Sequence, residues 1–184
     1  MFTKGSDYYT PRHYIKKFIW ALVHFLLFRY SPRLLYGWRN TLLRLMGASI
    51  GKNVKIFPSV QITYPWNLHI EDGSIISWKV ILYNLGPIHI GRNTIISQQA
   101  HICAGNHDYR NPRFTLLMPP ITIGDGVWIA ADAFIGPNIL IGNEAVIGAR
   151  AVITKNVEPK AVMVGNPAQF LKSRYTAKDI PAHG

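Results

Sequence analysis

The chain has 184 residues, a length that fits one domain of ordinary size. Hydrophobic residues make up 48% of it and charged residues 16%, which excludes a disordered tail protein, and its one cysteine, Cys103, excludes a disulfide framework and a multi-thiolate metal site. The net charge is +11, but residues 1–55 carry +9 and residues 56–184 only +2, so the basic character belongs to the first third of the chain.

The first 49 residues predict a basic and aromatic helical segment. A first helix is expected over residues 12–30, and its apolar run, residues 18–28, is shorter than the ~20 residues that span a membrane. No small-residue cleavage site follows this run, as a secretory signal would need. We therefore expect a cytoplasmic protein.

A second helix is predicted over residues 33–46. Ser31 and Pro32 favour its start, as N-cap and first helical residue, and Gly47 favours its end. The basic character of residues 1–45 suits peripheral contact with the inner face of a membrane. The alternative is that both helices pack on the rest of the chain or between subunits.

From residue 50 onward an aliphatic residue returns every six positions. These residues are Ile50, Ile56, Ile62, Ile70, Ile76, Leu82, Ile90, Ile96, Ile102, Ile123, Ile129, Ile135, Ile141, Ile147 and Ile153. A period of six fits neither a helix nor a long strand, but it fits a short strand and a turn, repeated. Three such hexads make one triangular coil with the aliphatic residue pointing inward, and the residue four positions later, such as Val54 or Ala133, must be small enough for the interior. Glycine after the first isoleucine of most coils relieves a crowded corner. The pattern predicts an all-β solenoid of about five stacked coils over residues 50–165.

One interval in this repeat is longer than the others. Ile90 and Ile123 are 33 residues apart, where other coils take 18 or 20, so about 15 residues leave the solenoid at roughly residues 106–122. Long excursions from a compact repeat are usually functional. After the last hexad, Asn166-Pro167 predicts a C-terminal helix over residues 168–175 within a final segment, 166–184, that covers the open end of the solenoid.

Several short motifs carry a family resemblance. They are Gly105-Asn106-His107-Asp108-Tyr109, Pro120 to Asp125, Val127 to Ala130, Ile147-Gly148-Ala149, Val152 to Lys155 and Gly165 to Ala168. Together with the hexads, they resemble the left-handed parallel β-helix acyltransferases, in the galactoside, maltose and xenobiotic O-acetyltransferase branch. Residues 31–39, 62–66 and 82–86 resemble acetyltransferases of exopolysaccharide biosynthesis, of the colanic-acid type.

The resemblance implies an acetyl-CoA-dependent O-acetyltransferase for a sugar hydroxyl of a polysaccharide precursor. It implies a homotrimer with active sites between subunits, and an acceptor that is free, nucleotide-linked or lipid-linked. Two other functions stay open: acetylation of a xenobiotic of the chloramphenicol type, and a non-catalytic β-helix binding protein. We expect no nucleic-acid partner, because the basic residues of the first segment alternate with long apolar runs.

His107 is the expected general base, because it lies in the extruded loop and matches the family motif. Histidine as a residue type suits this task, since its reference pKa is ~6.5. Asp108 or a backbone carbonyl would hold its other ring nitrogen and fix the tautomer. Tyr83 and Asn84, about one coil away, are candidate acceptor contacts. For each, the alternative is an outward polar residue with no catalytic part.

The acetyl-CoA contacts implied by the resemblance lie in the last coils. Trp128, Ala131 and Ala149 would border the pantetheine arm, and Thr154 and Lys155 would meet the nucleotide, where lysine neutralises phosphate. Two further candidate phosphate contacts follow the same argument: Arg150 and Lys172.

Metal and thiol chemistry are the weaker alternatives. His69, His89, His101 and His107 could in principle supply zinc ligands, but only His107 lies in a convincing motif, so we expect no metal. Cys103 is close to His107 in sequence, yet a lone thiol beside an inward isoleucine is more often a packing residue.

Overall fold

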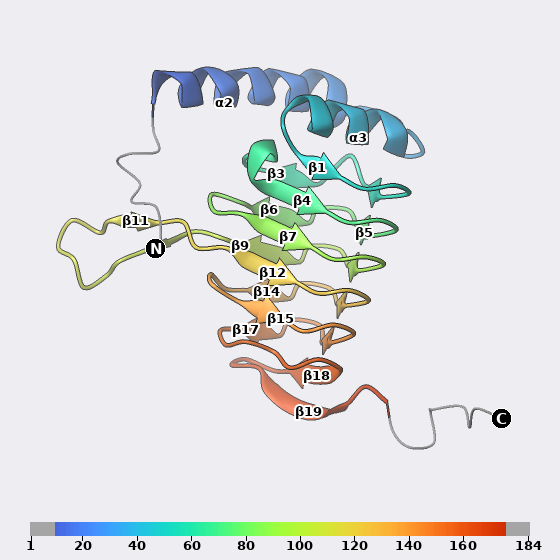
Figure 1. Ribbon diagram of the computed structural model, residues 1–184, viewed down its shortest axis with the longest axis vertical. Helices are drawn as coiled ribbons and strands as arrows, with labels where there is room; N and C mark the ends of the chain where they lie inside the picture. The colour runs from blue at the N-terminus through green and yellow to red at the C-terminus, as the bar shows by residue number, and fades with distance from the viewer. Residues whose placement is uncertain (1–9, 176–184) are drawn as a thin grey trace.

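The computed structural model describes residues 10–175, which form a left-handed parallel β-helix with helices across its N-terminal end (Figure 1). Its strands stack into three sheets that run along the solenoid axis. Sheet 1 contains β1 (Ser49–Ile50), β4 (Leu68–Ile70), β7 (Ile88–Ile90), β12 (Ile121–Ile123) and β15 (Leu140–Ile141). Sheet 2 contains β2 (Lys55–Ile56), β5 (Ile75–Ile76), β8 (Ile95–Ile96), β13 (Trp128–Ile129), β16 (Val146–Ile147), β18 (Ala161–Val164) and β19 (Gln169–Ser173). Sheet 3 contains β3 (Gln61–Ile62), β6 (Ile81–Tyr83), β9 (His101–Cys103), β14 (Phe134–Ile135) and β17 (Val152–Ile153).

The hexad prediction is confirmed at its inward positions. All fifteen aliphatic residues of the repeat are buried, from Ile50 to Ile153, and so are the smaller residues four positions later, such as Val54, Ala100 and Ala133. Register is kept between coils, since Ile56, Ile76 and Ile96 pair in turn along sheet 2. The solenoid has about six turns rather than the expected five, because β18 adds a further layer below β16.

Corner glycines admit the neighbouring coil. A Cβ placed at Gly91 would lie 2.5 Å from the Asp125 carboxylate and 2.5 Å from the Gly124 carbonyl carbon. A side chain there would have to displace the backbone of the next coil, which explains why glycine follows the first isoleucine of most coils.

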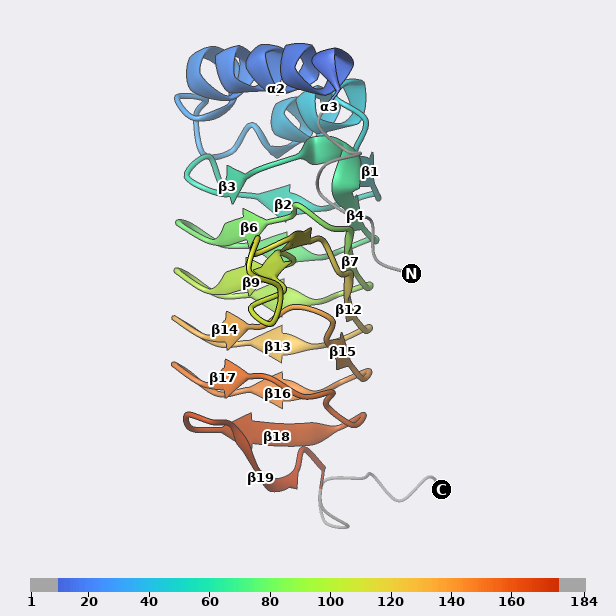
Figure 2. The same cartoon turned by 90° about the vertical axis from the view of Figure 1, so that its left-hand side faces the viewer.

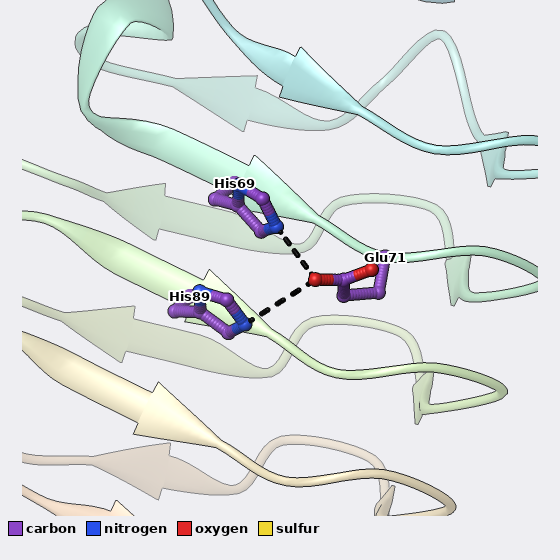
Figure 3. A group of neighbouring side chains, drawn as sticks. All are labelled: His69, Glu71 and His89. Atoms are coloured by element: carbon purple, nitrogen blue, oxygen red, sulfur yellow. Dashed lines mark hydrogen bonds and ion pairs between the residues drawn. The ribbon is translucent and has the colours of Figure 1, made fainter.

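The second and third coils each begin with two residues more than three hexads require, and these residues extend the strands of sheet 1. Leu68-His69 lies in β4 and Ile88-His89 in β7, so His69 and His89 are direct partners across the two coils. Their rings stack with centroids 4.3 Å apart, and both face Glu71 (Figure 3).

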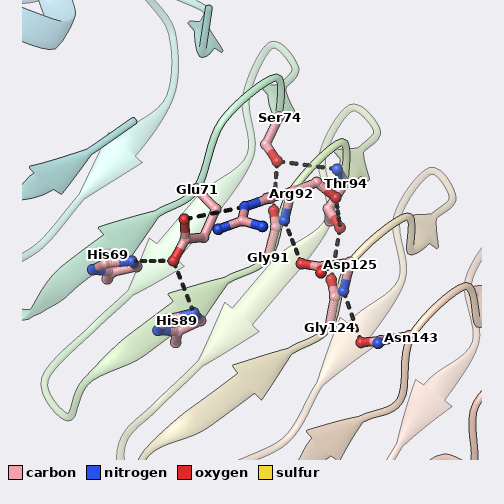
Figure 4. A network of polar contacts seen from close by, with 10 residues as sticks. All are labelled: His69, Glu71, Ser74, His89, Gly91, Arg92, Thr94, Gly124, Asp125 and Asn143. Carbon is pink, nitrogen blue, oxygen red and sulfur yellow. Dashed lines mark hydrogen bonds and ion pairs between the residues drawn. The ribbon is translucent and has the colours of Figure 1, made fainter. Parts of the chain in front are cut away.

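A ladder of side-chain hydrogen bonds links successive coils at the corner after sheet 1 (Figure 4). Asp125 Oδ1 accepts from the Arg92 backbone N–H at 2.7 Å, and Asn143 Oδ1 accepts from the Asp125 N–H at 3.0 Å. In the interior, Ser74 donates to the Gly91 carbonyl at 2.6 Å. The first two bonds satisfy backbone N–H groups of the turns, and the third satisfies the carbonyl oxygen of Gly91.

The N-terminal cap consists of α2 (Pro11–Val23), a π-helical turn η1 (His24–Phe28) and α3 (Tyr36–Leu45), and α2 lies across the end of the solenoid (Figure 2). Gly47 ends α3 as predicted, with φ +94°, its N–H on the Arg44 carbonyl and the Ala48 N–H on the Leu43 carbonyl. This is the Schellman pattern. The predicted start of this helix is wrong by three residues.

Ser31 does not cap α3 because it is used by a buried arginine. Its hydroxyl donates to the Phe28 carbonyl and accepts from Arg39, whose guanidinium is fully buried. Arg39 also donates to the carbonyls of Ile56, at 2.6 Å, and Pro32, at 2.8 Å. Arg39 therefore joins the cap to the first coil through carbonyl acceptors, and burial lowers its pKa.

The predicted C-terminal helix is wrong. Residues 169–173 form β19, which pairs antiparallel with β18, and the chain reverses at Asn166-Pro167. The final coil presents an unpaired strand edge, and the chain satisfies it by adding a strand rather than by covering it with a helix. A short 3-10 turn, η2 (Pro65–Asn67), replaces the hexad sub-pattern at Trp66. None of the helices described within residues 10–175 is long and apolar enough to cross a bilayer.

The corner packing predicts the effect of a single methyl group. Gly91→Ala should lower the free energy of unfolding by about 1–3 kcal/mol, because the new Cβ overlaps the next coil. Gly37→Ala is the matched control, since nothing lies within 4 Å of a Cβ at Gly37 in α3, and it should be neutral or slightly stabilising. Chemical denaturation of both variants measures the difference; equal stabilities would contradict the packing explanation.

Partly buried histidines predict acid sensitivity. Burial lowers the pKa of four of them in the folded state: His13, His24, His89 and His101. The unfolded chain then binds more protons, so their contribution is complete above pH ~6.5 and is lost as the pH falls through the lowered folded-state values. The melting temperature should fall between pH 7.5 and pH 5.5 at constant ionic strength.

His101 gives the sharper version of this test. Its Nε2 is buried without a hydrogen-bond partner, and its ring lies edge-on to Phe134 with centroids 5.3 Å apart. His101→Gln should reduce the dependence of the melting temperature on pH. An unchanged dependence would show that this histidine does not take up a proton on unfolding.

Candidate functional site

The extruded segment is a β-hairpin. The chain leaves the solenoid after β9, and β10 (Asn106–His107) pairs antiparallel with β11 (Leu116–Leu117) before the chain re-enters at β12. Buried Met118 packs with Tyr64 and Leu85 in a small cluster at the base of the hairpin. This cluster fixes the hairpin to the coil above it.

His107 has a defined ring orientation. Its Nδ1 lies 2.6 Å from the backbone carbonyl oxygen of Phe114, across the hairpin. A carbonyl oxygen only accepts hydrogen bonds, so Nδ1 carries the proton and Nε2 of the neutral ring keeps a lone pair. The side chain is exposed, and Nε2 is the atom available to take a proton.

His107 lines a cavity of about 370 Å³ at the base of the hairpin. Tyr83, from the coil above, lines the same cavity, as do Tyr109 and Phe114 from the hairpin. The structure therefore brings Tyr83 and His107 together, as expected. Of the two expected partners for the second ring nitrogen of His107, the structure shows the backbone carbonyl, that of Phe114. The side chains of Tyr109 and Phe114 were missed, and the aromatic residues inside the extruded segment were the signal for them.

Asp108 and Asn84 have other roles than those expected. Asp108 Oδ1 accepts from the Arg110 N–H at 3.1 Å and shapes the hairpin turn, while the carbonyl of Phe114 holds His107. Asn84 is fully buried, and its Oδ1 accepts from the N–H groups of Thr63 and Tyr64. A side chain with no exposed surface cannot contact an acceptor, so assigning Asn84 to the acceptor site is wrong; it braces two coils.

Thr154 and Lys155 line a second cavity, of about 360 Å³, with Pro167, Ala168 and Phe170. They follow β17, which is separated from β9 by β14 alone in sheet 3. The hairpin and Lys155 thus leave the same corner of the triangle, two strand spacings or about 10 Å apart along the axis. Thr154 and Lys155 of the Thr-Lys motif and Pro167 and Ala168 of the Asn-Pro-Ala motif therefore meet in this cavity.

The other expected cofactor contacts lie on a different part of the surface. Trp128 is in sheet 2, 47% exposed, with its Nε1–H on Ser97 Oγ at 3.0 Å. Ala131 and Ala149 occupy stacked corners between sheets 2 and 3, where the Arg150 N–H donates to the Ala131 carbonyl. Arg150 is exposed, with its Nε 3.6 Å from Asp132 Oδ2.

Lys172 lies opposite Val162 in the β18–β19 pair rather than on a helix. Within one chain, the structure therefore does not bring all the expected cofactor residues to one groove.

Two of the histidines considered as metal ligands, His69 and His89, lie together beside Glu71. His69 Nε2 is 2.9 Å and His89 Nε2 3.9 Å from Glu71 Oε1, and the ligand atoms of these three residues lie within 4.8 Å of one another (Figure 3). Bonds of ~2.1 Å to a tetrahedral zinc would separate ligand atoms by about 3.4 Å. Here the carboxylate already accepts from His69 and faces Arg92 Nε at 3.7 Å, which makes an ion-pair network on the surface (Figure 4). Cys103 Sγ is 3.5 Å from the Gly105 carbonyl oxygen.

Comparison with known proteins identifies the family. The family model for the bacterial transferase hexapeptide (six repeats) matches residues 120–155. The protein WcaF of Escherichia coli (strain K12), named for acetyl transfer in colanic acid biosynthesis, is 45% identical over 160 residues, which cover 87% of this chain and 88% of WcaF. The chain belongs to the hexapeptide-repeat acetyltransferases.

Solved structures of this family agree with the fold. A maltose O-acetyltransferase from Clostridium difficile 630 is 28% identical, with a TM-score of 0.77, over 86% of this chain and 87% of its own. A hexapeptide-repeat acetyltransferase from Vibrio cholerae, solved with acetyl-CoA, is 24% identical, with a TM-score of 0.81, over 91% of both chains. The fold and the acyltransferase class predicted from the hexads and motifs are confirmed.

Proposed function

We propose that this acetyltransferase moves an acetyl group from acetyl-CoA to a hydroxyl of a sugar in a polysaccharide precursor, with His107 as general base. The observation that carries the proposal is the hydrogen bond from His107 Nδ1 to the Phe114 carbonyl, because it leaves Nε2 as the basic atom beside a cavity. The name of WcaF, the maltose O-acetyltransferase structure and the neighbour solved with acetyl-CoA support the substrates.

The reaction is a direct transfer. His107 Nε2 takes the proton of the acceptor hydroxyl as the oxygen attacks the thioester carbonyl, and a tetrahedral oxyanion forms. The oxyanion collapses, the carbon–sulfur bond breaks, and the imidazolium returns its proton to the leaving CoA sulfur. The Phe114 carbonyl stabilises the imidazolium between these two steps, since Nδ1–H donates to it throughout.

The cavity lining fits a sugar acceptor. Tyr83, Tyr109 and Phe114 present aromatic rings beside His107. An aromatic ring offers a flat apolar face for the C–H face of a sugar, and the tyrosine hydroxyls offer hydrogen bonds to its hydroxyl groups. Tyr83 therefore remains a proposed acceptor contact.

Acetyl-CoA binding is proposed for two surfaces of the chain. Lys155 and Thr154, in the cavity beside Phe170, would receive phosphate oxygens of the nucleotide, whereas Trp128 and the small residues Ala131 and Ala149 would border the pantetheine arm. Arg150 and Lys172 remain further phosphate candidates. A homotrimer would reconcile these separate surfaces, because a neighbouring copy can supply the second wall of one groove.

Removal of the base tests the mechanism. His107→Ala should lower kcat for acetyl transfer to the sugar acceptor by about 10²–10⁴-fold with the fold intact, as measured by CoA release over a panel of sugars. His69→Gln, in sheet 1, is the histidine control and should keep full activity. A loss of less than tenfold in a folded His107→Ala protein would rule out His107 as the base.

A charge change tests the nucleotide contact. Lys155→Glu should raise KM for acetyl-CoA about tenfold, or ~1.4 kcal/mol, with little change in kcat. The same variant should not alter KM for acetyl-pantetheine, which lacks the nucleotide. Lys52→Glu, in the first coil, controls for net charge. An equal rise in KM for acetyl-CoA and for acetyl-pantetheine would show that Lys155 does not contact the phosphates of the nucleotide.

A further inference from the structure

The cap turns its apolar side chains outward. Along α2 and η1, only His13, Trp20 and Phe28 are buried, and they form a narrow stripe against the first coil. Trp20 donates its Nε1–H to the Ile62 carbonyl at 2.8 Å, and the Nε2 of His24 is 3.2 Å from the Val60 carbonyl oxygen. The side chains of Trp20 and His24 thus attach the segment to the first coil through hydrogen bonds, and most of the aliphatic side chains of the segment stay exposed.

The exposed apolar side chains of this segment form one continuous face. We call it the outer face; it consists of Tyr14, Ile15, Phe18, Ile19, Leu22, Phe25 and Leu26. Their spacing of three, four and seven residues places them on one side of the helix, opposite His13 and Trp20. Phe18 is 65% exposed and Leu26 62%. A contiguous apolar patch exposed on a globular protein marks a surface that contacts another molecule.

Positive charge surrounds the outer face. On a helical wheel, Arg12 and Lys16 flank it on one side and Lys17 on the other, and Arg29 follows at its end. Arg33 instead lies over the Phe57 ring of the first coil, 4.8 Å from its centroid. The sequence contains no Asp or Glu from residue 8 to residue 70. Within residues 10–175, no ion pair joins these basic side chains to an acidic one, so this part of the rim carries positive charge.

We propose that the outer face docks on an anionic lipid surface, with α2 lying in the plane of the interface. A helix of 13 residues is too short to span a bilayer but suits burial of an apolar face at the headgroup boundary, with basic side chains on the phosphates. A second copy of the chain fits less well, since two outer faces in contact would bring two basic rims together. Figures 1 and 2 show α2 lying across the end of the solenoid, beyond the three sheets. Since His13 and Trp20 are buried on the side of α2 that faces the first coil, the opposite side, which carries the outer face, points away from the sheets.

Vesicle binding of the full chain tests the proposal. Co-sedimentation should be strong with vesicles of phosphatidylcholine and 30% phosphatidylglycerol, weaker with phosphatidylcholine alone, and reduced at high salt. Phe18→Ser/Leu22→Ser/Phe25→Ser should weaken binding at least tenfold without lowering the melting temperature, because these side chains are exposed. Leu140→Ser/Leu171→Ser removes exposed apolar side chains far from the cap and should bind as the unaltered chain does.

A charge variant separates the electrostatic attraction to anionic lipid from the burial of apolar side chains. Lys17→Glu/Arg29→Glu should weaken binding to the anionic vesicles about tenfold or more and abolish the advantage over neutral ones. Equal binding of the unaltered chain and the serine variant would overturn the proposal. So would a doubled mass in light scattering that the serine variant removes while no vesicle is bound, because a second copy would then cover the outer face.

The docking proposal stands apart from the proposed function in this test. Acetyl transfer to a water-soluble sugar should be unchanged in the serine variant, since the outer face lies away from the His107 cavity. Loss of vesicle binding with full activity supports the proposal, whereas vesicle binding by a protein without sugar acetylation would refute only the proposed function.

Discussion

No coil of this protein can bury its own hydrophobic residues. Strands β1 to β17 are two or three residues long, so one coil forms no sheet by itself and each inward isoleucine needs the coils above and below to exclude water. Stacking is therefore the constraint on which the rest depends. It dictates the six-residue period, the small residues at the second inward position and the glycine at Gly91, where the next coil approaches too closely for a side chain.

Stacking also creates two ends, and the chain closes them differently. At the N-terminal end a buried guanidinium, Arg39, satisfies carbonyls of the first coil and of the loop before α3. At the other end β19 folds back and pairs with β18. The first solution uses side-chain donors and the second uses backbone donors; β19 pairs with the open edge of β18 and becomes the last strand of sheet 2.

The repeat made most of the fold predictable, because the same inward position recurs with the same chemistry in every coil. The errors fall where the repeat stops. Residues 168–175 carry no period of their own, and tertiary pairing with β18 overrode their modest helical preference. The start of α3 was misplaced because the capping tendency of Ser31 was outweighed by its bond to Arg39. Asn84 was predicted to be a site residue because the turn that buries it, η2 in the coil above, does not follow the hexad and was not predicted.

The site was predictable only in its central residue. His107 was identified from a short motif, but its partner is a backbone carbonyl, and no side-chain pattern reveals that Phe114 would lie across a hairpin from it. The proposed cofactor residues were identified as one set, whereas stacking distributes them over two sides of a triangular prism. Sequence order gives the coil of each residue; the side of the prism follows from its phase within the hexad.

The number of coils also sets the distance between the cap and the extruded hairpin. The hairpin leaves after β9, two strand spacings or about 10 Å beyond β3 in the first coil, and the helical cap adds a layer of about 10 Å. A chain docked by its outer face would therefore hold His107 about 20 Å above the lipid. Because each coil adds one strand spacing of about 5 Å along the axis, inserting or deleting one coil between the cap and β9 would change this height by that amount.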